Sequence, residues 1–196
     1  MYTVIGSIRS RTFRVLWMLE ELGQPYDHHP ASPRSEDVTA HSPAGKVPVL
    51  LDDGTPLTDS TAILTYLADK HGALTHPAGT IERARQDGHT QFLLDEFDAL
   101  LWTASRHSFI LPEELRVPAI KDTLKHEYLT SLDRLAARVG KGPFLMGRTM
   151  TVPDIIACHC GGWAVAAKFP QPAGALKDYF TRLRNRPAYQ KVSQLG

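Results

Sequence analysis

The sequence predicts an α/β domain with the element order βαβ-α-ββα, followed by an all-α helical domain. Three observations lead to this prediction. Extended, helical and extended segments follow one another over residues 2–29. An Asp-Asp-Gly turn at 52–54 comes directly after an apolar run, which is typical of a hairpin between antiparallel strands. After residue 80 the strand signals vanish, and apolar residues recur at helical spacing.

The first three elements form a strand–helix–strand unit. Residues 2–6 predict a buried strand because their hydrophobicity is partly continuous. A polar loop then leads to an amphipathic helix that begins at Thr12 or Phe13 and ends at Gly23. Residues 25–29 are extended again, so we expect a parallel strand pair joined by a right-handed crossover.

The remaining elements of this half are a loose helix at 34–40, a strand at 47–51 and its hairpin partner. Pro48 cannot donate to a sheet, so it should begin an edge strand or line an opening. Its position between a glycine-lysine turn and a strand also makes it a candidate for a cis peptide bond. Behind an Asp-Ser pair, residues 61–71 predict a helix. This order is thioredoxin-like, but no cysteine lies in this half, so we expect no thioredoxin-type redox chemistry.

The second half reads as helical throughout. A stretch with a proline and a glycine but no periodic pattern predicts a linker ahead of it. We therefore place the first domain at 1–74, the linker at 75–80 and the all-helical domain at 81–196. Long helices are expected at 81–108 and 121–139, because apolar residues share one face of each.

Two motifs of the second domain are expected to be structural. Thr151 and Asp154 form a capping box, in which each side chain accepts from the other's backbone amide at the start of a helix. Asp154 is therefore not taken as a catalytic acid. Cys158 and Cys160 flank a histidine in an apolar stretch, which predicts buried or half-buried thiols and no disulfide. No second Cys/His pair could complete a zinc site, so we expect no metal.

The composition excludes several classes of protein. Hydrophobic residues make up 42% of the 196 residues and charged residues 22%, as in soluble globular proteins. The net charge of +1 provides no basic surface for nucleic acid. No apolar run approaches the ~20 residues of a membrane span, and the N-terminal residues lack a signal-peptide pattern. We therefore expect a cytoplasmic protein with no nucleic-acid or membrane partner.

One stretch gathers groups suited to binding an anion. Lys46, an extended backbone at Val47 and Pro48, and a helix that begins at Asp59 and Ser60 lie within fifteen residues. A lysine, backbone amides and a helix N-terminus together form a receptor for a small peptide-like anion.

These residues resemble a known family. The run Gly45-Lys46-Val47-Pro48-Val49-Leu50 with Asp59-Ser60-Thr61-Ala62-Ile63 is similar to the glutathione-binding half of the cytosolic glutathione transferases. The resemblance extends along the whole chain. It implies a transferase that activates the glutathione thiol as thiolate, for attack on small electrophiles or for reduction of organic peroxides. Glutathione would be the co-substrate, with no metal.

The resemblance also implies a role for each residue. Lys46 would pair with a glutathione carboxylate, while Val47 would offer its backbone N–H and C=O like an added strand. Pro48 would keep Val47 facing the ligand. Asp59 and Ser60 would hold the γ-glutamyl amino and carboxylate groups, although an ordinary helix cap also explains Ser60. Many members have Glu in place of Asp59, which shortens the reach here.

The thiolate donor is expected in the loop ahead of the first helix. Ser10-Arg11-Thr12-Phe13-Arg14-Val15 resembles the serine-type bacterial and theta-like members, so the resemblance assigns Ser10. Ser7 is the competing residue. Ser10 or Thr12 could also simply cap the helix.

Two further expectations come from the resemblance. The chain should form a two-fold homodimer, in which Asp95 reaches the neighbour's glutathione or is merely a surface carboxylate. The alternative function is a transferase-like binding or scaffold protein that keeps the fold without turnover.

Overall fold

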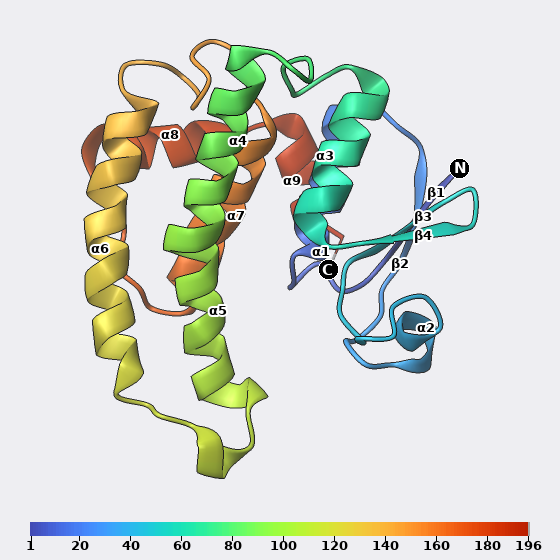
Figure 1. Cartoon of the computed structure of the whole chain (residues 1–196), viewed down its shortest axis with the longest axis horizontal. Helices are drawn as coiled ribbons and strands as arrows, with labels where there is room; N and C mark the ends of the chain where they lie inside the picture. Colours follow the sequence, from blue (N-terminus) through green and yellow to red (C-terminus); the bar gives the residue numbers. More distant parts are fainter. Residues whose placement is uncertain (196) are drawn as a thin grey trace. The chain divides into compact units, whose positions relative to one another are not determined.

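A computed structural model of the chain describes residues 1–195. Its contacts group into two units. The first contains Met1–Ala78 together with residues 184–195, and the second contains Gly79–Leu183. Figure 1 labels the helices and strands and colours the chain by residue number.

The first unit is built on a four-stranded sheet with the order β2-β1-β3-β4. Its strands are β1 (Tyr2–Ile5), β2 (Tyr26–His29), β3 (Val49–Asp52) and β4 (Thr55–Thr58). The β1–β2 pair is parallel and the other pairs are antiparallel. The predicted thioredoxin-like class is thus confirmed. Strand β3 begins after Pro48, because proline has no N–H for the ladder.

Four helices belong to the first unit: α1 (Thr12–Glu21), α2 (Glu36–Thr39), α3 (Ser60–His71) and α9 (Pro187–Ser193). The core of α1 is fully buried from Val15 to Leu19. The sequence assigns all of 81–196 to the second domain, whereas contacts place α9 with the first unit. The reason is the packing of Tyr189 against the aromatic residues of α1.

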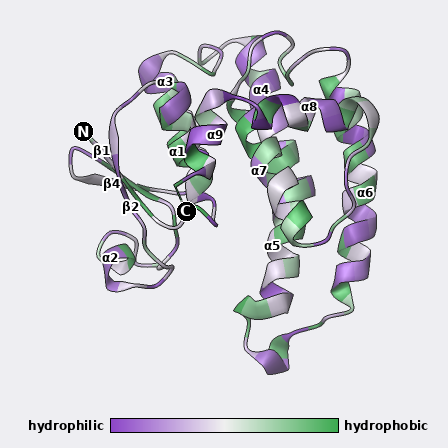
Figure 2. Ribbon diagram, turned by 180° about the vertical axis from the view of Figure 1, so that it is seen from behind, coloured by the Kyte–Doolittle hydropathy of each residue, from purple (hydrophilic) through white to green (hydrophobic). Residues whose placement is uncertain are grey.

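The second unit is helical. It contains α4 (Ile81–Leu93), η1 (Leu94–Asp98), α5 (Ala99–Ser105), η2 (Arg106–Ile110), η3 (Glu113–Leu115), α6 (Ile120–Val139), α7 (Val152–Ala166) and α8 (Gly174–Arg184). The single helix predicted at 81–108 is one helical run interrupted by π-helical turns at η1 and η2. Figure 2 shows hydrophobic residues along α7, whose first nine positions except His159 are buried.

The capping box at the start of α7 is present as predicted. The Asp154 carboxylate is fully buried and accepts from Thr151 N–H at 2.8 Å, Leu145 N–H at 2.9 Å and Tyr179 O–H at 2.8 Å. Burial raises the pKa of Asp154, and these hydrogen bonds oppose the rise.

The two cysteines of α7, Cys158 and Cys160, are buried and are not joined by a disulfide, as predicted. Within residues 1–195, no helix combines the length and the apolar character needed to cross a lipid bilayer.

Candidate functional site

The loop between β1 and α1 makes a close turn at Gly6. Its φ of +139° is one that side-chain-bearing residues rarely adopt. A Cβ added at Gly6 would lie 2.2 Å from the Thr12 Oγ1 and 2.9 Å from the Val47 Cβ. Glycine is therefore required here, because the backbone at Gly6 touches both the first turn of α1 and the residue before Pro48. The contact joins two predicted parts of the site that are far apart in the sequence.

The Ser10 hydroxyl forms hydrogen bonds within this loop. It donates to the Ser7 carbonyl at 2.7 Å and lies 2.9 Å from the Thr12 hydroxyl, while its oxygen accepts from the Thr12 N–H at 3.1 Å. Ser10 therefore stabilises the start of α1, as the cap alternative expects. Its single proton serves the Ser7 carbonyl or the Thr12 hydroxyl before any ligand arrives.

The Ser7 hydroxyl differs from that of Ser10 in its hydrogen bonds. The Ser7 hydroxyl oxygen accepts from the Arg9 N–H at 3.2 Å, and the side chain is half-buried. In the part of the chain that the structure describes, no acceptor receives the Ser7 hydroxyl proton. That proton is available to a ligand without breaking a hydrogen bond.

The Val47–Pro48 peptide bond is cis, as the sequence predicts. Pro48 is buried, Val47 is half-buried and Lys46 is exposed. Across residues 1–195, neither the N–H nor the C=O of Val47 has a hydrogen-bond partner. A half-buried backbone with both groups unpaired is suited to an incoming extended peptide, because buried backbone groups are nearly always paired. Lys46 forms no ion pair with any described residue, so its ammonium group is free to meet a carboxylate.

Asp59 caps α3. Its Oδ1 accepts from the Thr61 N–H at 2.9 Å and from the Ala62 N–H at 3.1 Å. The residue has a φ of +69°, which is uncommon for a residue other than glycine, and the two hydrogen bonds hold it there. The cap of α3 is thus Asp59 and not Ser60, the residue for which the sequence offered a cap, and it uses one of the two carboxylate oxygens of Asp59.

Ser60 is the first residue of α3 and is only 3% exposed. Its hydroxyl oxygen accepts from the Arg14 Nη1 at 3.4 Å, a long hydrogen bond that connects α3 to α1. No residue of the described chain accepts from the N–H or the O–H of Ser60. Two donors thus remain at the positive end of a helix, which is an arrangement that binds carboxylates.

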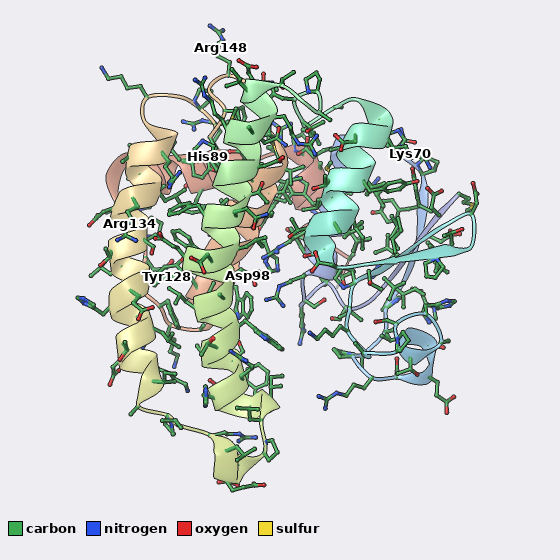
Figure 3. All side chains as sticks on the ribbon, in the orientation of Figure 1. Lys70, His89, Asp98, Tyr128, Arg134 and Arg148 are labelled. Atoms are coloured by element: carbon green, nitrogen blue, oxygen red, sulfur yellow. The ribbon has the colours of Figure 1, made fainter. Side chains whose placement is uncertain are left out.

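A cluster of polar side chains that is not among the sequence predictions joins β1, β3 and α3. The Asp52 carboxylate accepts from Lys70 and Tyr66, and the hydrogen bond from Lys70 is the main reason for the lowered pKa of Asp52. Figure 3 labels Lys70, which lies on α3. Its ammonium group also lies 5.1 Å from the centre of the Tyr2 ring. No pattern in the sequence indicates this cluster, because its members come from three separate elements.

A shallow hollow lies beside this cluster and is lined by Asp52, Asp53, Thr55, Leu57, Tyr66 and Lys70. None of the predicted site residues lines it. Because its ion pair and hydrogen bonds are satisfied internally, we interpret the cluster as fastening the hairpin to α3 and place the candidate site at Gly6, Val47 and Ser60.

The chain is similar to proteins of one family. Residues 9–77 match the domain family described as glutathione S-transferase, N-terminal domain. A solved structure of a glutathione transferase from Methylococcus capsulatus has a TM-score of 0.85 and 27% sequence identity, and the match covers 98% of this chain and 97% of that one.

Two curated proteins are also similar. The probable elongation factor 1-gamma 2 of Arabidopsis thaliana is 30% identical over 170 residues, which is 81% of this chain and 39% of that protein. Glutathione S-transferase 3 of Schizosaccharomyces pombe is 40% identical over 73 residues, which is 35% of this chain and 30% of that protein. The chain thus aligns with less than half the length of either relative.

Proposed function

The chain belongs to the cytosolic glutathione transferase family, and from this premise we propose that its first unit binds glutathione and activates the thiol as thiolate. The observation that carries the proposal is the unpaired backbone of Val47 beside Gly6. An extended peptide laid along Val47 would have its cysteinyl backbone paired there, and its sulfur would lie near the loop of Ser7 and Ser10.

The two ends of glutathione would meet charged groups. The glycine carboxylate would pair with the exposed ammonium group of Lys46. The γ-glutamyl carboxylate would accept from the free N–H and O–H of Ser60. The γ-glutamyl amino group would bind the Asp59 oxygen that does not cap α3. Pro48 would keep the backbone of Val47 facing the ligand.

The chemistry requires a thiolate. A free thiol has a pKa of about 8.5, so only a few per cent is ionised at neutral pH. A hydroxyl donor and the positive end of α1 would lower this pKa. The thiolate would then form a carbon–sulfur bond with a small electrophile, whose leaving group departs with the bonding electrons. With an organic peroxide, two glutathione molecules would yield glutathione disulfide, an alcohol and water.

The donor would be a serine of the loop. The sequence proposes Ser10, which would have to turn its proton away from the Ser7 carbonyl toward the sulfur. Ser7 is the competing donor, and it would lose no hydrogen bond in serving the sulfur. Helix α1 and the loop amides would add positive potential in either case.

The deciding measurement is the ultraviolet thiolate signal of bound glutathione as a function of pH, for Ser10→Ala and for Ser7→Ala. A hydrogen bond to a charged group is worth about 1.5–3 kcal/mol, so loss of the true donor should raise the thiol pKa by about one to two units. The rate at neutral pH should fall about tenfold or more, with little change in affinity. A shift only in Ser7→Ala would assign Ser7. No shift in either variant would contradict activation by a serine.

The alternative is a binding or scaffold protein that keeps the site without turnover. The observation that favours this alternative is a sequence match to a protein named as an elongation factor. The match has 30% identity and covers 81% of this chain. Two measurements separate the active transferase from the binding protein. Retention on immobilised glutathione tests binding, and assays with chlorodinitrobenzene and cumene hydroperoxide test turnover. Binding without turnover on both substrates and on further electrophiles would support the alternative.

A further inference from the structure

The C-terminal helix α9 is fastened to α1 by a buried carboxylate. Glu21 accepts two parallel hydrogen bonds from the guanidinium of Arg186, from Nε at 2.6 Å and from Nη2 at 2.6 Å. The Glu21 side chain is only 7% exposed, and it also accepts from the Trp17 indole N–H at 2.8 Å. Paired hydrogen bonds to a planar guanidinium fix orientation as well as distance. The end of α1 is therefore held in one place by α9.

An aromatic cluster fastens the other end of α1. The Tyr189 ring of α9 lies edge-on to Phe13 and to Trp17, with its centre 5.0 Å from each ring. Phe13 and Trp17 also meet edge-on at 6.3 Å. Tyr189 thus contacts α1 at its second residue and again one turn later.

Phe13 connects this cluster to the candidate site. Its N–H donates to the Ser10 carbonyl at 3.1 Å, and it directly follows Thr12, whose N–H donates to the Ser10 hydroxyl. Movement of the Phe13 ring would therefore move the turn that carries Ser10. Hydrogen bonds weaken steeply with misalignment, and the influence of a helix end is confined to its first turn.

We infer that Arg186 and Tyr189 are positioning residues for thiol activation: through α1, α9 sets the geometry of the loop that would meet the glutathione sulfur. This inference rests on the proposed function. Of the residues that would hold the rest of glutathione, Val47 lies outside these contacts, and Ser60 is joined to α1 by the long 3.4 Å hydrogen bond from Arg14. Loosening α9 should therefore change the thiolate more than the affinity.

The test compares Arg186→Gln and Tyr189→Leu with the wild type in the full chain. The measured quantities are the thiol pKa of bound glutathione, the affinity, and kcat with chlorodinitrobenzene. We expect the pKa to rise by about half to one unit, with kcat at neutral pH about three- to tenfold lower and Kd changed less than about twofold. Arg186→Lys keeps the positive charge, so its thiol pKa and kcat should lie closer to those of the wild type than the values of Arg186→Gln do.

Lys191→Met is the matched control. Lys191 lies on the same helix and pairs with Glu20 of α1, but its side chain is 67% exposed, so its loss should leave the thiol pKa unchanged. Variants that lower thermal stability but leave the thiol pKa unmoved would show that α9 is only structural and would overturn the inference. If Arg186→Gln does not fold, an unmoved pKa in Arg186→Lys and Tyr189→Leu overturns it as well.

Failure of the proposed function has a different signature. A wild type that shows no binding of glutathione overturns both the proposed function and the inference built on it. A wild type with a clear thiolate signal, together with variants that match it, overturns the inference alone.

Discussion

Lys46 and Asp59 are the exposed candidate residues, and Lys46 is the one that would meet the glycine carboxylate of glutathione. It would contact a carboxylate remote from the sulfur, and that contact would be the same in the ground state and the transition state. Lys46→Ala should therefore raise the KM for glutathione, with a much smaller effect on kcat. Steady-state kinetics with glutathione varied at saturating electrophile measures both. A large fall in kcat at saturating glutathione would show that Lys46 acts on the chemistry itself.

Asp154 is the residue whose loss should affect folding rather than binding. Asp154→Ala would leave four buried donors without this acceptor, namely the N–H groups of Leu145 and Thr151 and the O–H groups of Thr151 and Tyr179. Each buried unsatisfied group costs about 1–3 kcal/mol, and the costs are not fully additive, so we expect a loss of about 3–5 kcal/mol. Urea unfolding measures this loss. Asp154→Asn, which keeps one acceptor oxygen, should cost less, and a loss below about 1 kcal/mol in the alanine variant would contradict this account.

At the scale of elements, the stability of the second unit should depend on pH through His89 of α4. Figure 3 labels His89 on α4 and Arg134 on α6. Burial lowers the pKa of His89 below 6.5, and the positive charge of Arg138 on α6 lowers it further. The unfolded chain therefore takes up a proton at a higher pH than the folded chain. Stability should be lost as the pH falls from above 6.5 through the folded pKa.

The corresponding experiment is urea unfolding of the wild type and His89→Gln at pH near 7.5 and near 5. Glutamine does not titrate, so the variant should lose less unfolding free energy between the two pH values. Arg138→Gln should reduce the same loss by a smaller amount, because burial is the larger cause. Equal losses in the wild type and in His89→Gln would exclude His89 as the titrating group.

For the whole molecule, the family leads us to propose a two-fold homodimer. Sedimentation at micromolar concentration should give twice the chain mass of 21.7 kDa. Asp95 lies exposed on η1, so it is accessible to a second copy. If it reaches the partner's glutathione, Asp95→Ala should raise the KM for glutathione in the dimer. A monomer in sedimentation would exclude this role for Asp95 together with the dimer.

The sequence by itself determined the fold class and the features that depend on near neighbours. The hairpin turn at 52–54, the capping box at Asp154 and the cis bond before Pro48 each follow from residues a few positions apart. Local geometry limits such segments to few conformations, so residue type predicts them. The candidate residues Lys46, Asp59 and Ser60 belong to this class, because their positions relative to a turn or a helix start are local.

Only the tertiary structure decided which distant segments meet. It places Gly6 against Val47, connects Arg14 to Ser60, and joins α9 to α1. It also shows that the Ser10 hydroxyl donates within the loop, whereas no acceptor among residues 1–195 receives the Ser7 proton. Such contacts depend on how separate elements pack and on which hydrogen bonds their backbones leave open. No period or turn signal encodes them, because each pairing is selected by the burial and hydrogen bonding of the whole unit.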